Sequence, residues 1–114
     1  MSKPKDEIKV IILPDAQIQV SDAFDYINDV LRNDIAANKF IKDFRCLRKR
    51  IKNNPLGYTV HESNVVDVEF RKATLGNYLV FFRIVGNVVY IAFVLYGKRD
   101  HDRILVTYRG EHEE

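Results

Sequence analysis

Residues 78–95, YLVFFRIVGNVVYIAFVL, decide how this chain must fold. Two runs of β-branched and aromatic residues flank Gly86-Asn87, a dipeptide that suits a two-residue turn with Gly86 at positive φ. The stretch is predicted to be a β-hairpin and not a membrane span, because Arg83 and the turn interrupt the apolar run. Both faces of the hairpin are mostly apolar, so we expect central strands with helices packed on at least one side.

A two-residue turn fixes the register of the hairpin. The predicted pairs are Val85 with Val88, Arg83 with Tyr90, Phe81 with Ala92 and Tyr78 with Leu95. Because successive side chains of a strand point to opposite faces, Tyr96 is expected on the same face as Arg83 and Tyr90.

Two apolar stripes with helical spacing precede the hairpin, at residues 16–31 and 37–51. The polar break at residues 32–34 between them predicts an antiparallel helical hairpin. Asp15 is placed to cap the first helix. Asn54-Pro55 is expected to end the second, because the residue before a proline is disfavoured in the helical conformation.

The remaining segments complete a β-α-α-β-β-β order. Residues 7–13 read as a strand that Pro14 stops, and residues 66–71 alternate apolar and charged side chains as a half-buried strand does. Residues 100–105 could form one short helical turn. We therefore predict a single α+β domain over residues 1–114, an antiparallel sheet with a helical hairpin packed on it, with flexible tails at 1–6 and 106–114.

Composition narrows the class of protein. A hydrophobic fraction of 46%, a charged fraction of 30% and a net charge of +2 are those of an ordinary globular domain. No signal-peptide pattern follows the N-terminus, so the cytoplasm is the expected location. The three histidines, His61, His101 and His112, are far apart, and because two of them lie in polar segments solvated histidine is the expected state; no metal or other cofactor is predicted. The single cysteine, Cys46, is expected to be a small packing residue of the second helix.

The second helix has a strong local bias in charge. Seven basic residues and one acid, Asp43, lie between Lys39 and Lys52. Three interpretations remain open: a solvated helix face, contact with phosphates, or contact with an acidic protein. The basic residues expected on the outward side are Arg45, Arg48, Lys49 and Lys52.

Basic residues also occur on the predicted sheet. Arg71 is expected on the side of Asp67 and Glu69, where a cross-strand ion pair is the structural alternative to a functional role. Arg83, inside an apolar strand, could form a salt bridge or stack on Tyr90. An exposed sheet face with arginines and tyrosines would suit RNA, because arginine holds phosphate and tyrosine stacks on bases.

The blocks 70-FRKATLGNYLVFFRI-84 and 88-VVYIAFVLYGKRD-100 resemble the terminal blocks of the RelE/ParE superfamily of bacterial type II toxins. The resemblance runs from about Glu7 to Leu105, and residues 14–16 and 55-PLGY-58 match in position. It implies a small toxin that inhibits growth and that a cognate antitoxin binds and neutralises.

The resemblance leaves the target open. RelE-like members cleave mRNA on the ribosome, and Arg71 and Arg99 match basic positions of those enzymes. For such an endoribonuclease we assign phosphate and transition-state charge to Arg71, Arg83 and Arg99, with Tyr96 as the acid/base or stacking group. The chain departs from that pattern, with Leu105 where those enzymes place a tyrosine and Tyr96 where many have histidine. The residues assigned to RNA binding are Arg45, Arg48, Lys49, Lys52, Lys72 and Lys98.

ParE-like members instead poison DNA gyrase without catalysis. In that case the helical hairpin and the C-terminal segment would be the interaction surface. A third alternative is a degenerate member that survives as an antitoxin-binding module.

Overall fold

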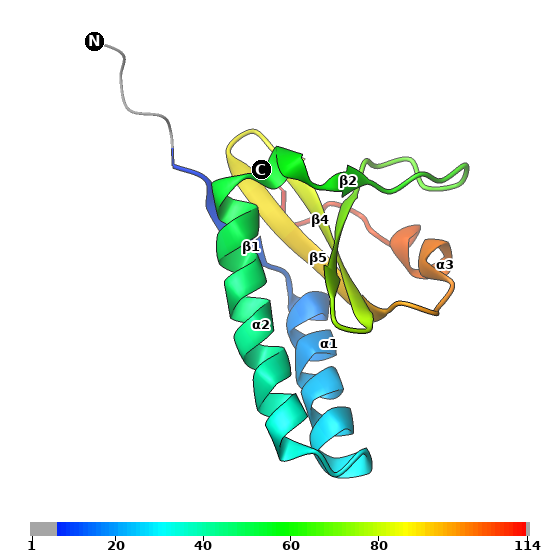
Figure 1. Ribbon diagram of the computed structural model, residues 1–114. Coiled ribbons are helices and arrows are strands. Elements are labelled where there is room, and N and C mark those ends of the chain that lie inside the picture. The colour runs from blue at the N-terminus through cyan, green and yellow to red at the C-terminus, as the bar shows by residue number, and fades with distance from the viewer. Residues whose placement is uncertain (1–6, 114) are drawn as a thin grey trace.

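The computed structural model describes residues 7–113, which form an open five-stranded sheet with two long helices against one face (Figure 1). The strand order is β1-β5-β4-β3-β2, with β1 parallel to β5 and every other neighbouring pair antiparallel. The predicted α+β class is confirmed. The elements are β1 (Lys9–Ile12), α1 (Pro14–Asp25), η1 (Tyr26–Val30), α2 (Asp34–Asn53), η2 (Pro55–Gly57), β2 (Thr59–Val60), β3 (Arg71–Leu75), β4 (Tyr78–Val85), β5 (Val88–Tyr96) and α3 (His101–Leu105).

The helical hairpin forms where the apolar stripes predicted it. The first helix begins at Pro14, whose fixed φ suits the first helical position, and Leu13 precedes it without a side-chain cap. The expectation that Asp15 caps this helix was wrong. The chain reverses at Arg32, whose φ is 52°, and the Asn33 side chain accepts a hydrogen bond from Ala36 N at 3.0 Å to start α2.

The β4–β5 hairpin keeps the predicted register only near its turn. Gly86 has a φ of 62°, and the pairs Val85–Val88 and Arg83–Tyr90 are confirmed. Beyond Ile91 a bulge inserts one extra residue, so the predicted pairs Phe81–Ala92 and Tyr78–Leu95 were wrong. The observed partners are Phe93 for Phe81 and Tyr96 for Tyr78.

The predicted strand at residues 66–71 was also wrong, except at Arg71. The third strand begins only at Arg71, and β2 is a two-residue strand at Thr59–Val60. The backbone N–H of His61 still donates to Phe70 O at 2.7 Å, and residues 62–69 leave the sheet, with Val66 and Val68 packed against the sheet face opposite to the helices. Their alternation reflects contact with that face, because a loop lying on an apolar surface can also bury every second side chain.

Both faces of the sheet are covered. On the helix face, residues such as Phe82 and Val80 pack against apolar side chains of α1 and α2. The second face is covered by residues 61–70, α3 and the chain that follows it. Phe70, Phe81, Phe93 and Leu105 are 3% exposed or less there. The sheet face that was expected to be exposed to solvent is therefore covered.

The C-terminal segment takes part in this cover. The sequence predicted a flexible tail from residue 106, but Tyr108 packs its ring against Phe70 and Phe93, and Glu113 reaches Arg83. The tail predicted at 1–6 lies outside the described residues. None of the helices within residues 7–113 combines the length and apolarity needed to cross a lipid bilayer.

A side chain of α1 completes the edge of β5. The first strand ends at Ile12, and the backbone N–H of the buried Val94 donates instead to Gln19 Oε1 at 2.7 Å. Gln19→Met should lower the free energy of unfolding by about 1–2 kcal/mol, because it leaves a buried donor unsatisfied. Urea denaturation measures this. Gln17→Met, on the exposed side of the same helix, is the matched control and should cost less; equal losses would contradict the assignment.

Candidate functional site

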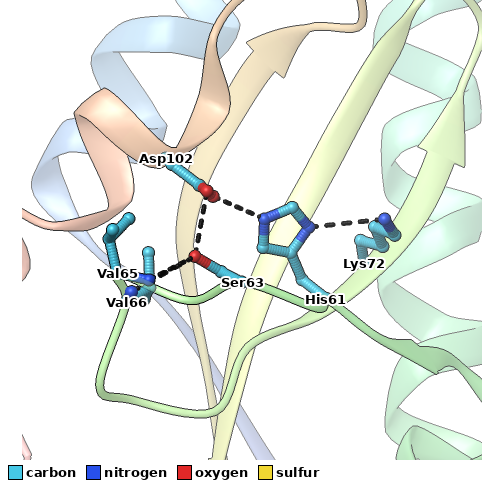
Figure 2. Close-up of polar contacts among 6 residues, drawn as sticks. All are labelled: His61, Ser63, Val65, Val66, Lys72 and Asp102. Carbon is cyan, nitrogen blue, oxygen red and sulfur yellow. Dashed lines mark hydrogen bonds and ion pairs between the residues drawn. The ribbon is translucent and has the colours of Figure 1, made fainter.

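A cluster of polar contacts on the second sheet face surrounds His61, which follows β2 (Figure 2). Its Nε2 lies 2.8 Å from Asp102 Oδ1 in α3, and the Ser63 hydroxyl donates to the other oxygen of Asp102 at 2.9 Å. Lys72 Nζ of β3 lies 3.3 Å from His61 Nδ1. We call these four residues, His61, Ser63, Lys72 and Asp102, the His61 cluster.

The contacts of the cluster fix the roles of the imidazole nitrogens. The ammonium of Lys72 can only donate, so Nδ1 of His61 accepts and Nε2–H donates to Asp102. Hydrogen bonds from His61 and then from Ser63 hold the pKa of Asp102 below its ordinary value. The His61 side chain is 12% exposed and its ring packs edge-on against Phe81.

This arrangement is better suited to linking segments of the chain than to transferring a proton. A general base needs a free nitrogen within hydrogen-bond reach of its substrate, and both nitrogens of His61 are occupied. The cluster instead joins three segments, the loop after β2, the third strand and α3. Among the described residues, no group of three or more potential ligands is placed to hold a metal ion.

Solvated histidine was the expectation from the polar segments, but His61 is largely buried. His101 is also partly buried, with its ring on Phe81 and its Nε2 3.0 Å from Tyr96 O. Only His112 is exposed. Cys46 is exposed on α2, so its predicted packing role was wrong as well.

Arg71 contacts the chain that leads from α2 into β2. Its Nη1 donates to Tyr58 O at 2.6 Å, and its Nη2 lies 3.7 Å from a carboxylate oxygen of Glu69. The guanidinium is 18% exposed, and its Nε is buried with no hydrogen-bond partner among the described residues. These contacts restrict the guanidinium, and they place it on β3 next to Lys72, which points to the opposite face.

Arg83 lies on the second sheet face, where it forms a largely buried ion pair with Glu113. Its Nε and Nη2 donate to the two oxygens of Glu113 at 2.9 and 3.0 Å, and Glu113 also accepts from the Tyr108 hydroxyl. The two side chains of the pair are 18% and 16% exposed. The hydrogen bond from Arg83 lowers the pKa of Glu113, and burial first of all raises the pKa of Tyr108.

Tyr96 lies on the helix face of the sheet, not on the face of Arg83. Its ring packs edge-on against Tyr78, with centroids 5.6 Å apart, and Tyr78 in turn contacts Phe40 of α2. The predicted sharing of one face by Tyr96, Arg83 and Tyr90 was therefore wrong, because the bulge at Ala92 reverses the parity of the residues beyond it.

Tyr96 and Arg99 come together in a groove between the helical hairpin and the Tyr78 end of the sheet. Its volume is about 810 Å³. Burial and the neighbouring Tyr26 and Tyr96 raise the pKa of Tyr78 there. Apolar lining comes from both helices and from the sheet, including Ile27, Leu31, Phe40 and Val94.

The residues assigned to RNA binding do not form one site. Arg45, Arg48, Lys49 and Lys52 are exposed on α2, on the helix side of the molecule. Lys72 is held by His61 on the opposite face. Lys98 is exposed in the turn after β5. Of the four residues assigned to catalysis, only Tyr96 and Arg99 share a surface, and Arg71 and Arg83 are engaged elsewhere.

Comparisons with known proteins agree with this fold. A family model described as "ParE toxin of type II toxin-antitoxin system, parDE" matches residues 10–101. The solved structure "Chromosomal ParDE TA system from P. aeruginosa" superposes with a TM-score of 0.66 at 18% identity, covering 81% of this chain and 98% of that one. A search of curated protein sequences found no match.

The fold and these matches define a type II toxin of the RelE/ParE superfamily. Within it, the chain belongs to the ParE toxin family, whose model spans most of its length. The resemblance seen in the two sequence blocks is thereby confirmed. A toxin of this family implies an antitoxin as its partner.

Proposed function

We propose that this chain arrests growth in the cytoplasm by trapping DNA gyrase on DNA, and that it does so without a catalytic step of its own. The sequence resemblance allowed this mechanism beside cleavage of mRNA on the ribosome. The match to the ParE family supports the gyrase mechanism. An antitoxin expressed with the chain would keep it neutralised.

The positions of Tyr96 and Arg83 support the gyrase mechanism over cleavage of mRNA. Cleavage of a phosphodiester needs an acid/base group and cationic groups within reach of the same phosphate. Here the bulge at Ala92 puts Tyr96 on the helix face, whereas Arg83 lies on the opposite face in its pair with Glu113. This separation favours a toxin that acts by contact.

The groove and the adjoining hairpin tip offer a surface for such contact. The exposed fractions of Val30 and Ile35 at the tip are 64% and 79%, and Tyr26 and Leu31 are about half exposed beside them. An apolar surface that is left open on a single chain marks a protein interaction site. We assign protein contacts, with gyrase or with the antitoxin, to the groove and this tip.

The mechanism is tested by inducing the chain briefly from a tightly repressed promoter. Covalent gyrase–DNA complexes, trapped with detergent, should accumulate, and mRNA 5′ ends mapped in a translating extract should stay unchanged. The variant Val30→Ser/Ile35→Ser should lose the complexes while its circular dichroism spectrum stays native, because both side chains are largely exposed. Ile18→Ser/Leu56→Ser, at exposed apolar side chains outside the groove and the tip, is the matched control and should keep them.

Codon-phased cuts in mRNA that disappear in Arg71→Ala and Arg99→Ala would overturn this proposal in favour of the endoribonuclease. If the chain still binds its antitoxin but produces neither gyrase–DNA complexes nor mRNA cuts, both mechanisms are refuted. The chain is then the degenerate antitoxin-binding module.

A further inference from the structure

A continuous basic face runs along α2 on the side away from the sheet. Lys42, Arg45, Lys49 and Lys52 follow one another at spacings of three, four and three residues, which places them on one side of a helix with 3.6 residues per turn. All four are exposed, whereas Phe40, Phe44, Leu47 and Ile51 are buried on the sheet side. We call these four residues the basic face.

The charges of the basic face are not balanced within the molecule. Among the described residues the one ion pair on α2 joins Lys39 to Asp43 at 2.6 Å, and no acidic side chain pairs with the four cations. Like charges three and four residues apart on a helix repel. The chain has a net charge of only +2, so this clustering is local and not a consequence of a generally basic protein.

The geometry points to a stiff polyanion as the partner. From Lys42 to Lys52 the helix advances by ten residue steps, about 15 Å of helix axis at 1.5 Å per residue. Duplex DNA presents a negative charge about every 1.7 Å of its axis, so a rigid row of this length faces about nine phosphate charges. Single-stranded RNA is recognised largely by stacking on aromatic rings. The aromatic residues of α2, Phe40 and Phe44, are buried, which disfavours that partner.

We propose that the basic face of α2 binds the phosphate backbone of double-stranded DNA, independently of base sequence. This inference rests on the proposed function and deepens it, because a toxin that traps gyrase on DNA would then contact the duplex as well as the enzyme. The groove is lined by Ala36, Lys39 and Asp43, which lie on a different side of α2 from the basic face. A protein in the groove and a duplex on the basic face could bind at the same time.

Fluorescence anisotropy of the purified chain with a labelled 24-bp duplex of arbitrary sequence tests the proposal. At 50 mM salt the duplex should bind, and the logarithm of the binding constant should fall against the logarithm of salt with a slope of about −3.6 for four phosphate contacts. The variant Arg45→Gln/Lys49→Gln/Lys52→Gln should bind at least about tenfold more weakly, with a slope near about −0.9.

The matched control is Lys9→Gln/Arg103→Gln/Arg109→Gln, which removes the same charge from exposed residues outside α2. It should bind within about twofold of the native chain if contacts and not net charge decide affinity. Equal losses in the two variants would overturn the proposal. So would tighter binding of a single-stranded RNA of equal length, or the absence of duplex binding at 50 mM salt.

The outcome is separable from that of the gyrase experiment. If the chain forms gyrase complexes but does not bind free duplex DNA, only the proposed binding of DNA by the basic face is refuted. Duplex binding without gyrase complexes would refute only the proposed target.

Discussion

Replacing Phe81 by alanine is expected to lower the free energy of unfolding by about 3–5 kcal/mol, the largest stability loss that we predict. Phe81 is fully buried in the centre of the second sheet face. The rings of His61 and His101 pack on it at centroid distances of 5.3 and 5.2 Å. The truncation therefore removes core volume and also the surface against which α3 and the loop after β2 are held.

Urea denaturation followed by circular dichroism measures the loss, and hydrogen exchange shows where it acts. Amides of α3 should lose protection before those of the central strands. Phe81→Leu should cost far less, and Ile18→Ala, at a side chain 59% exposed, should change stability by less than about 0.5 kcal/mol. A loss below about 1 kcal/mol for Phe81→Ala would contradict the packing described for this face.

The parts of the fold that depend on local pattern were predictable from the sequence. The Gly86-Asn87 turn, the apolar stripe of α2 and its end before Pro55 each follow from residues that are close along the chain. The bulge at Ala92 was not, because it adds one residue to a strand that is apolar on both faces. A period of two cannot reveal a shift where neither face is polar.

The single inserted residue, Ala92, determines which side chains meet at the candidate site. With Ala92 inserted, Tyr96 lies beside Tyr78 on the helix face of the sheet instead of beside Arg83. The His61 cluster was missed for a different reason. His61 and Asp102 are 41 positions apart, and no sequence pattern around either residue predicts its contact with the other. The alternation at residues 66–71 predicted a strand because a loop packed on an apolar face has the same pattern.

Arg83→Met is expected to lower the free energy of unfolding by about 3 kcal/mol at neutral pH. Removing one member of a largely buried ion pair leaves the other charge without its partner. Glu113 would lose both donors of the guanidinium and keep only the Tyr108 hydroxyl. The C-terminal segment should then separate from the second sheet face, which thermal denaturation and proteolysis of the tail would both report.

The pH dependence of this loss identifies its cause. Arg83 lowers the pKa of Glu113 in the folded state from an ordinary value of 4.5, so the ion pair stabilises the fold above that pH. As the pH falls below 4.5 and through the lowered pKa, Glu113 takes up a proton in the folded state and the stabilisation disappears. The difference in stability between the native chain and Arg83→Met should therefore shrink over this range. The double variant Arg83→Met/Glu113→Leu, which leaves no charge, should recover most of the loss at neutral pH. If the double variant is as unstable as the single one and the loss does not change with pH, the pair does not hold the C-terminal segment.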